Sequence, residues 1–277
     1  MKKIRKKDLL MQALIWLCAL LTVGILVWIV TYILINGLSN LSWTFISTQY
    51  KGDQHGILPM ILSTVYIVLL SVAIAAPVGI GAAIYLIEYA REGKILTFIR
   101  FATETLAGIP SIIYGLFGFI FFVIYLKLGF SLLSGALTLC IMVLPTIIRT
   151  TEEALKAVPA SYREGSLALG ATKLQTIRLI ILPSAIPGIL TAIILSIGRI
   201  VGETAAIYLT AGMVTRFPGS IMDSGRTLSV HLYMLAKEGL SFEEAFATAV
   251  ILIMLVAAIN FATSFTAGKI KKSLGGR

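Results

Sequence analysis

Long apolar stretches, separated by short polar segments, dominate this chain of 277 residues. Six of them are long enough for a helix to cross about 30 Å of hydrocarbon, which takes around 20 residues. They lie at about residues 10–36, 57–87, 106–126, 131–148, 184–210 and 245–267. All six are continuously apolar, whereas the strands of a membrane barrel alternate apolar and polar residues. The pattern predicts an all-α membrane protein with six transmembrane helices over residues 10–267, between tails at 1–9 and 268–277.

Charge adds an orientation to this picture. Only 13% of the residues are charged and the mean hydropathy is +0.95, although the net charge of +10 could suggest a nucleic-acid partner. However, 17 of the 23 Lys and Arg residues lie in the two tails and in the loops 88–105 and 149–183. Positively charged loops stay in the cytoplasm. The basic excess therefore reflects topology, not nucleic-acid binding. It predicts a multi-pass protein of the cell membrane with both termini cytoplasmic.

The first apolar stretch could also be a cleaved signal peptide. Its apolar run of roughly 26 residues is longer than the 7–15 residues of a signal-peptide core, which predicts a retained helix. Cys18 and Cys140 fall within predicted spans and are interpreted as packing residues, since no metal or disulfide spacing is present. His55 and His231 lie in outer segments, where no role is assigned to them.

The second stretch carries a possible interruption. Pro77 removes one helical hydrogen bond, and Gly79 and Gly81 loosen the same turn. We expect a helix break there, with a tilted helix and a tolerated kink as the alternative. In the third stretch, Gly115 and Gly118 predict a face that packs closely against a neighbouring helix.

The 149–183 loop is ordered by its own sequence. Ser161 and Glu164 form one predicted capping box, so a short helix is expected from residue 162 to about 169. Gly170 would then take the left-handed position after the helix end. Thr172 and Gln175 form a second predicted capping box, which begins a helix ending before Pro183. The loop is therefore predicted to be a cytoplasmic helix–glycine–helix unit.

The same loop resembles the EAA loop of ABC-importer permeases, which is Glu-Ala-Ala, three residues, Gly, nine residues and Ile-x-Leu-Pro. The family positions fall on Glu164, Gly165, Ser166, Gly170, Ile180, Leu182 and Pro183, with Gly165 and Ser166 in place of two alanines. In that family the loop forms the coupling helix, which docks in a groove on the ATPase subunit. Capping and the bend would also explain Glu164 and Gly170 without that role.

Further segments, at 56–59, 76–89, 108–118 and 198–206, resemble the A-type (PstA) permease subunits of phosphate-specific ABC importers, in the MetI-like family of binding-protein-dependent permeases. The resemblance implies a non-catalytic permease subunit that binds no cofactor or metal. It implies a C-type permease subunit as heterodimer partner, a cytoplasmic ATPase dimer that binds the ATP, and an extracytoplasmic phosphate-binding protein. The chain has no G-x-x-x-x-G-K-[ST] motif of its own for ATP phosphates.

Arg199 and Glu203 lie within the fifth apolar stretch. A charge at the bilayer centre costs about 2.5–3.5 kcal/mol and usually faces a pathway or a partner. Four residues apart, the two side chains can share one helix face, so a buried ion pair is one interpretation. The other is a substrate pathway in which Arg199 attracts inorganic phosphate and Glu203 orients it.

Two alternative functions stay open at this point. One is an importer permease for another oxyanion, such as molybdate or sulfate. The other is a secondary transporter that uses Arg199 and Glu203 without ATP, although the chain has no evident inverted repeat to support it.

Overall fold

The computed structural model describes residues 6–51 and 54–273. Most of the predicted tail at 1–9 and the end of the tail at 268–277 lie outside these ranges. The helices before the first long loop are α1 (Lys6–Leu38), α2 (Trp43–Ser47), α3 (Leu58–Ile84), α4 (Lys94–Ala107), α5 (Ser111–Gly118) and α6 (Leu132–Lys156). Those after it are α7 (Ala160–Ala168), α8 (Lys173–Thr176), α9 (Leu182–Gly202), α10 (Ala205–Thr210), α11 (Leu228–Glu238) and α12 (Phe242–Ser273). Three π-helical segments extend them: η1 (Tyr85–Tyr89), η2 (Phe119–Tyr125) and η3 (Ile177–Ile181).

Five described helical runs are long and apolar enough to cross a membrane, and α4 with α5 and η2 makes a sixth if that bent pair counts as one span. The predicted all-α membrane fold is therefore confirmed. The only strands among the described residues form a small antiparallel hairpin, β1 (Tyr50–Lys51) with β2 (Gln54–His55).

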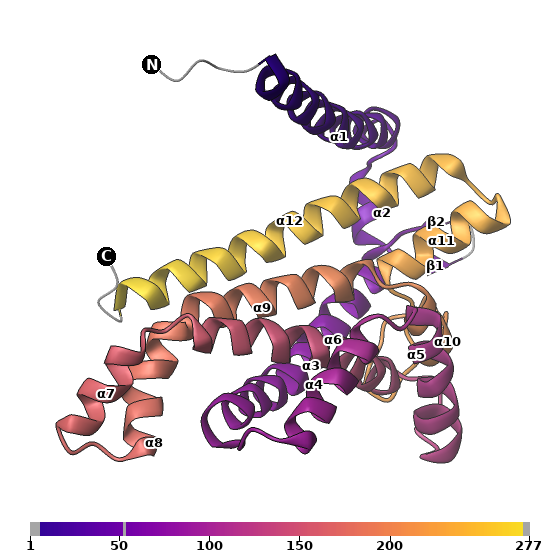
Figure 1. Ribbon diagram of the computed structural model, residues 1–277. Helices are drawn as coiled ribbons and strands as arrows, with labels where there is room; N and C mark the ends of the chain where they lie inside the picture. The colour runs from indigo at the N-terminus through magenta and orange to yellow at the C-terminus, as the bar shows by residue number, and fades with distance from the viewer. Residues whose placement is uncertain (1–5, 52–53, 274–277) are drawn as a thin grey trace.

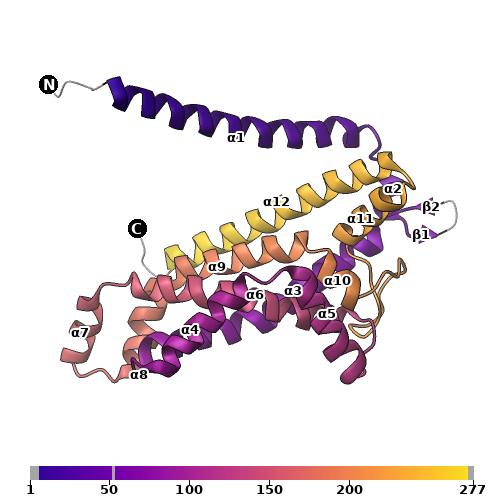
Figure 2. The same ribbon diagram turned by 45° about the vertical axis from the view of Figure 1, so that its right-hand side comes forward.

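The core of the bundle lies between α3 and α6, with α9 and α12 alongside (Figure 1). Small residues such as Ala75, Ala136 and Ala192 are fully buried, which lets these helices approach closely. Larger side chains, among them Leu139 and Ile147, fill the space between them. The α7–α8 loop and the C-terminal end of α12 lie at one end of the bundle, and the β1–β2 hairpin and α11 at the other (Figure 2).

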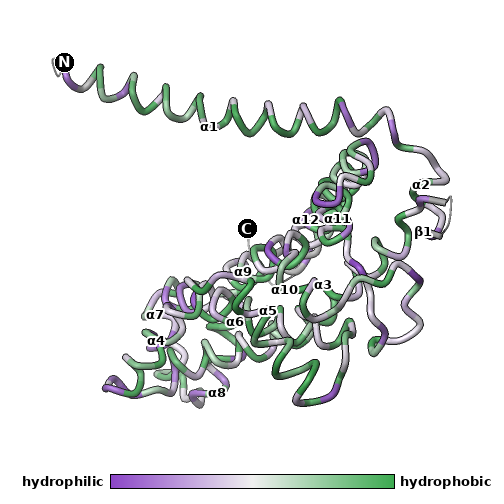
Figure 3. Tube along the Cα trace, turned by 90° about the vertical axis from the view of Figure 1, so that its right-hand side faces the viewer, coloured by the Kyte–Doolittle hydropathy of each residue, from purple (hydrophilic) through white to green (hydrophobic). Residues whose placement is uncertain are grey.

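The first helix stands largely apart from this bundle. Apolar residues run along its length (Figure 3). None of its 18 most apolar consecutive residues is buried against the rest of the described chain. Its contact with α12 is near its own C-terminal end, where the rings of Tyr32 and Phe246 lie 5.7 Å apart.

The helix break expected at Pro77, Gly79 and Gly81 is not found, because α3 stays helical through all three residues. Lipid-facing helices tolerate proline when neighbouring turns adjust their hydrogen bonds. The irregular hydrogen bonding comes instead four residues after Gly81, in the π-helical η1.

The third predicted span does break. α4 begins at Lys94, within the predicted loop 88–105, and the helix axis turns by 101° between α4 and α5. Pro110 has no N–H to continue α4, and it precedes the first residue of α5. Gly115 and Gly118 do pack closely: a Cβ atom on Gly115 would lie 2.8 Å from the Ala206 Cα of α10.

Two boundaries around the 149–183 loop also differ from the prediction. α6 runs on to Lys156, because Lys156 pairs with Glu152 and Glu153 one turn earlier and extends the helix. The helix after the loop does not end before Pro183 but continues from Lys173 to Gly202. Pro183 follows the π-helical η3, in which the Leu182 N–H donates to the Ile177 carbonyl five residues earlier, so the altered turn accommodates the missing donor.

Candidate functional site

The fifth span is interrupted at its charged residues. α9 ends at Gly202, Glu203 takes an extended conformation (φ −73°, ψ 133°), and α10 begins at Ala205. The single span predicted over 184–210 is therefore wrong in its outer part. Glu203 does not share a helical face with Arg199, since it lies outside the helix.

The carboxylate of Glu203 accepts hydrogen bonds from backbone N–H groups. Its Oε1 accepts hydrogen bonds from the N–H groups of Thr204 and Ala206, both at 3.2 Å. These are the first donors of α10, which have no partner within the helix. The Glu203 carbonyl accepts a further bond from Ser229 Oγ of α11 at 2.6 Å. Glu203 thus fixes the start of α10 against α11.

Arg199 lies in the last turn of α9 and is partly exposed. Among the described residues it forms no ion pair and no hydrogen bond, so the predicted Arg199–Glu203 pair is not found. Its charge acts on the hydroxyl of Tyr114, a buried residue of α5. Gly198 and Gly202 leave open space beside it on both sides.

Tyr114 connects this position to the break in the third span. Its hydroxyl donates to the Leu106 carbonyl of α4 at 2.8 Å, across the bend between α4 and α5. Because α5 also packs against α10, the interruptions of the third and fifth spans lie side by side. Sequence reasoning missed Tyr114, since a single tyrosine in an apolar stretch gives no signal of its own.

The 149–183 loop has the expected bend with different caps. α7 begins after Pro159, and no side chain of Ser161 caps it, so the first predicted capping box is wrong. The helix therefore starts two residues earlier than the serine cap predicts, directly after Pro159. Gly170 takes φ +83°, in the left-handed region that favours glycine. Thr172 and Gln175 form the second capping box as predicted.

The side chains of the loop divide into two sets. Glu164, Gly165 and Gly170 are exposed, and α7 buries none of its residues. Ser166 instead turns inward, where its Oγ lies 2.9 Å from Thr176 Oγ1. Ile180, Leu182 and Pro183, partly buried, belong to the continuous helix after the bend.

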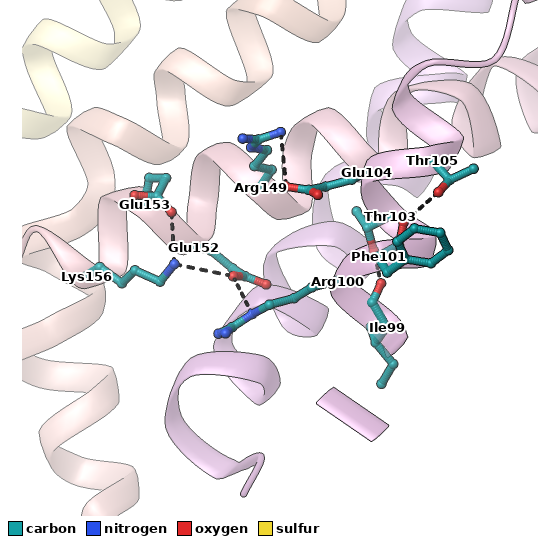
Figure 4. Close-up of polar contacts among 10 residues, drawn as sticks. All are labelled: Ile99, Arg100, Phe101, Thr103, Glu104, Thr105, Arg149, Glu152, Glu153 and Lys156. Carbon is teal, nitrogen blue, oxygen red and sulfur yellow. Dashed lines mark hydrogen bonds and ion pairs between the residues drawn. The ribbon is translucent and has the colours of Figure 1, made fainter. Parts of the chain in front are cut away.

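A charged cluster between α4 and α6 was not anticipated (Figure 4). Glu152 is buried, and its Oε2 lies 3.7 Å from Arg100 Nε and 3.8 Å from Lys156 Nζ. Arg149 Nη1 lies 3.6 Å from Glu104 Oε1. The Arg100–Glu152 and Arg149–Glu104 pairs fasten α4 to the end of α6, beside an open pocket of about 140 Å³.

Both histidines, to which no role was assigned, have specific partners. His55 Nδ1 lies 3.0 Å from Glu244 Oε1, which joins the hairpin to the start of α12. His231 of α11 is fully buried beside Arg226, whose Nη1 lies 3.4 Å from its Nδ1. Burial, helped by the Arg226 charge, lowers the pKa of His231 to about 3.

Comparisons with known proteins match this geometry to one family. Residues 75–274 match the model of the "Binding-protein-dependent transport system inner membrane component" family. The chain is 35% identical to the probable ABC transporter permease protein YqgI of Bacillus subtilis, covering 96% of this chain and 97% of that protein. It is 33% identical to the phosphate transport system permease protein PstA 2 of Mycobacterium tuberculosis, covering 78% of this chain and 73% of that protein.

Solved structures give the fold independently of close sequence similarity. The chain superimposes on a chain of a bacterial alginate ABC transporter, crystallised with an alginate-bound periplasmic protein, with a TM-score of 0.68. The match covers 97% of this chain and 96% of that one, at 14% sequence identity. At this identity the likeness concerns the arrangement of helices alone.

Proposed function

This chain belongs to the family of binding-protein-dependent transport system inner membrane components, and we propose that, as a permease subunit of such an ABC importer, it carries inorganic phosphate. It is a non-catalytic, multi-pass inner membrane protein. Family membership argues against the secondary-transporter alternative, because an ABC importer derives its energy from ATP.

The observation that carries the phosphate proposal is the unpaired guanidinium of Arg199 where two spans are interrupted. A charge held there without a counter-ion among the described residues is available to an anion, and a guanidinium presents a planar fork of donors that suits phosphate. The similarity to phosphate transport permeases supports the same cargo. Glu203 acts beside it by holding α10 in place, which shapes the pathway next to Arg199.

The coupling loop (149–183) is proposed to receive motion from the ATPase through α7. A helix that buries none of its own residues yet exposes Tyr162, Leu167 and the following Leu169 offers an apolar surface to a partner. Glu164 and Gly165 lie on this exposed helix, while Gly170 sets the angle to the helix that continues through Ile180, Leu182 and Pro183.

The partners follow from what the chain supplies. We propose a C-type permease subunit that completes the pathway, a cytoplasmic ATPase dimer that binds the ATP, and an extracytoplasmic phosphate-binding protein. The α7–α8 loop then lies in the cytoplasm, together with both termini. No cofactor is assigned to this subunit.

Uptake of radiolabelled phosphate tests the cargo. The complete transporter is expressed in a strain that lacks its own phosphate importers, with excess unlabelled phosphate, molybdate or sulfate as competitors. We expect uptake that only unlabelled phosphate suppresses. Suppression by molybdate or sulfate to the same extent, or no phosphate uptake, would replace phosphate with another oxyanion.

A further inference from the structure

Arg163 of α7 joins three helices. Its Nε and Nη2 donate hydrogen bonds to Glu88 Oε1 at 3.1 and 3.0 Å. Nη1 donates to the Val158 carbonyl at 3.2 Å, and Nη2 also donates to the Leu155 carbonyl at 3.0 Å. Leu155 lies in the last turn of α6 and Val158 just after it, where the helix dipole favours a cation. The guanidinium therefore binds α6 and the end of α3 to α7.

Glu88 also contacts the part of the coupling loop that follows the Gly170 bend. It lies in η1, at the end of α3, and its side chain is only 8% exposed. Its backbone carbonyl accepts a hydrogen bond from Lys173 Nζ, and the same ammonium lies 4.9 Å from the centre of the Tyr89 ring. Lys173 begins α8, on the far side of the Gly170 bend from Arg163. Glu88 therefore contacts the coupling loop on both sides of Gly170.

Among the described residues, α7 makes side-chain hydrogen bonds through Arg163 and Ser166. The Ser166 side chain bonds to Thr176, near the start of the continuous helix that runs from Lys173 to Gly202. The bond from Arg163 to Glu88 crosses 75 positions of sequence and ends on α3, the helix that packs most extensively on α6. A displacement of α7 relative to α3 and α6 therefore acts on this pair, alongside the short link from α6 to α7 and the contacts of α7 with η3.

We propose that Arg163 and Glu88 are the positioning residues through which α7 moves α3, and that the pair sets how much transport each ATP drives. The proposal rests on the proposed function, in which α7 docks on the ATPase. π-helical segments are uncommon and often lie at functional sites, and η1 aims the Glu88 carboxylate at the loop. Since the pair is largely buried, the loss of one partner leaves the other charge without compensation.

A double-mutant cycle tests the pair in the complete transporter, reconstituted in proteoliposomes with its ATPase. The readout is phosphate transported per ATP hydrolysed, beside co-purification of the ATPase as a measure of assembly. Arg163→Gln and Glu88→Gln should each lower this ratio about tenfold, within the range of coupling between linked sites. The double variant should lower it no further, because the two residues act as one unit. Arg163→Lys keeps the charge with fewer donors and should recover part of the ratio.

Lys156→Gln is the matched control. Lys156 is a nearby cation whose pairs with Glu152 and Glu153 stay within α6, so the ratio should not change. An unchanged ratio in Arg163→Gln, or losses that multiply in the double variant, would overturn the proposal.

A second readout does not depend on the cargo. In a Cys18→Ser/Cys140→Ser background, spin labels at Ser161→Cys on α7 and Leu69→Cys on α3 report their separation. We expect one narrow distance that persists when the complex is trapped with ATP and vanadate, and a broadened distribution after Arg163→Gln. An equally narrow distribution in that variant would contradict the link. If the unsubstituted complex takes up no phosphate, the cargo proposal fails while this measurement still decides the link.

Discussion

Arg199 and Glu203 lie on opposite sides of a helix end, and their charged groups do not pair. Arg199 occupies the last turn of α9, whereas the Glu203 carboxylate accepts the N–H groups of Thr204 and Ala206 at the start of α10. The two charges therefore have separate tasks in our proposal, and their substitutions should have different effects.

Arg199→Ala should abolish phosphate uptake while the transporter still assembles, because no described protein group depends on the guanidinium for a hydrogen bond. A hydrogen bond to a charged group is worth about 1.5–3 kcal/mol, so uptake should fall at least about tenfold. Uptake by proteoliposomes and co-purification of the ATPase measure the two effects. Arg199→Lys, which keeps the charge without the fork, should retain part of the uptake. Loss of assembly in Arg199→Ala would make the residue structural.

Glu203→Ala should destabilise the fold by about 1 kcal/mol, the usual cost of removing a cap from a helix start. Glu203→Gln keeps an oxygen acceptor for the same two donors, so its thermal unfolding in detergent should stay near that of the unsubstituted protein. Equal losses of stability in both variants would mean that the negative charge, rather than the cap, holds α10.

Gly118→Ala should destabilise the protein by about 1–3 kcal/mol, as overpacking does. A Cβ atom there would overlap the Thr138 side chain and lie 2.9 Å from Thr210 Cγ2. Both threonine hydroxyls are held by backbone carbonyls, so neither side chain can rotate away without losing a bond. Thermal unfolding measures the effect.

Gly165→Ala is the matched control for that substitution. Nothing lies within 4 Å of the position of its Cβ atom, and α7 should gain up to about 1 kcal/mol from the better helix former. A loss of stability in Gly165→Ala as large as that in Gly118→Ala would show that glycine replacement itself, not crowding, is responsible.

Acid should lower the stability of the protein around α11, because His231 becomes protonated. Its folded pKa of about 3 lies below the ordinary 6.5, so the unfolded chain binds the proton more readily. The stability that this histidine contributes is complete above about pH 6.5 and is lost as the pH falls toward 3. At 1.36 kcal/mol per pH unit, the loss between pH 6.5 and 5 is about 2 kcal/mol.

Unfolding of purified protein across this pH range measures the slope. His231→Phe keeps the edge contact with Tyr50 and should remove the slope. His55→Gln removes the other histidine and should leave it. A slope that survives His231→Phe would assign the acid sensitivity to other groups.

The sequence was sufficient for the membrane class and the family, because both rest on long apolar runs and fixed spacings. It located the Gly170 bend for a local reason, since a glycine directly after a helix end readily takes the left-handed conformation. It placed the end of the helix before Pro183 wrongly, because the rule that proline ends a helix ignores the π-helical turn that precedes this proline.

The contacts that organise the candidate site could not be predicted in the same way. The break at Glu203 lies inside a long apolar run. Its cause is the Glu203 carboxylate, which accepts the N–H groups of the residues that follow it. The partner of Arg163 comes from a distant segment and that of Tyr114 from the preceding helix, and without coordinates nothing in their local sequence identifies Glu88 or Leu106.

The isolation of α1 has a consequence for how the protein responds to its bilayer. Its apolar run, Leu9–Leu38, would measure about 45 Å as a helix, against a hydrocarbon core of about 30 Å. A helix with such a mismatch tilts, and packing against neighbours ordinarily fixes its tilt angle. Since most of α1 has no neighbour among the described residues, lipid thickness sets its inclination in the isolated chain, while the interlocked helices of the bundle keep theirs.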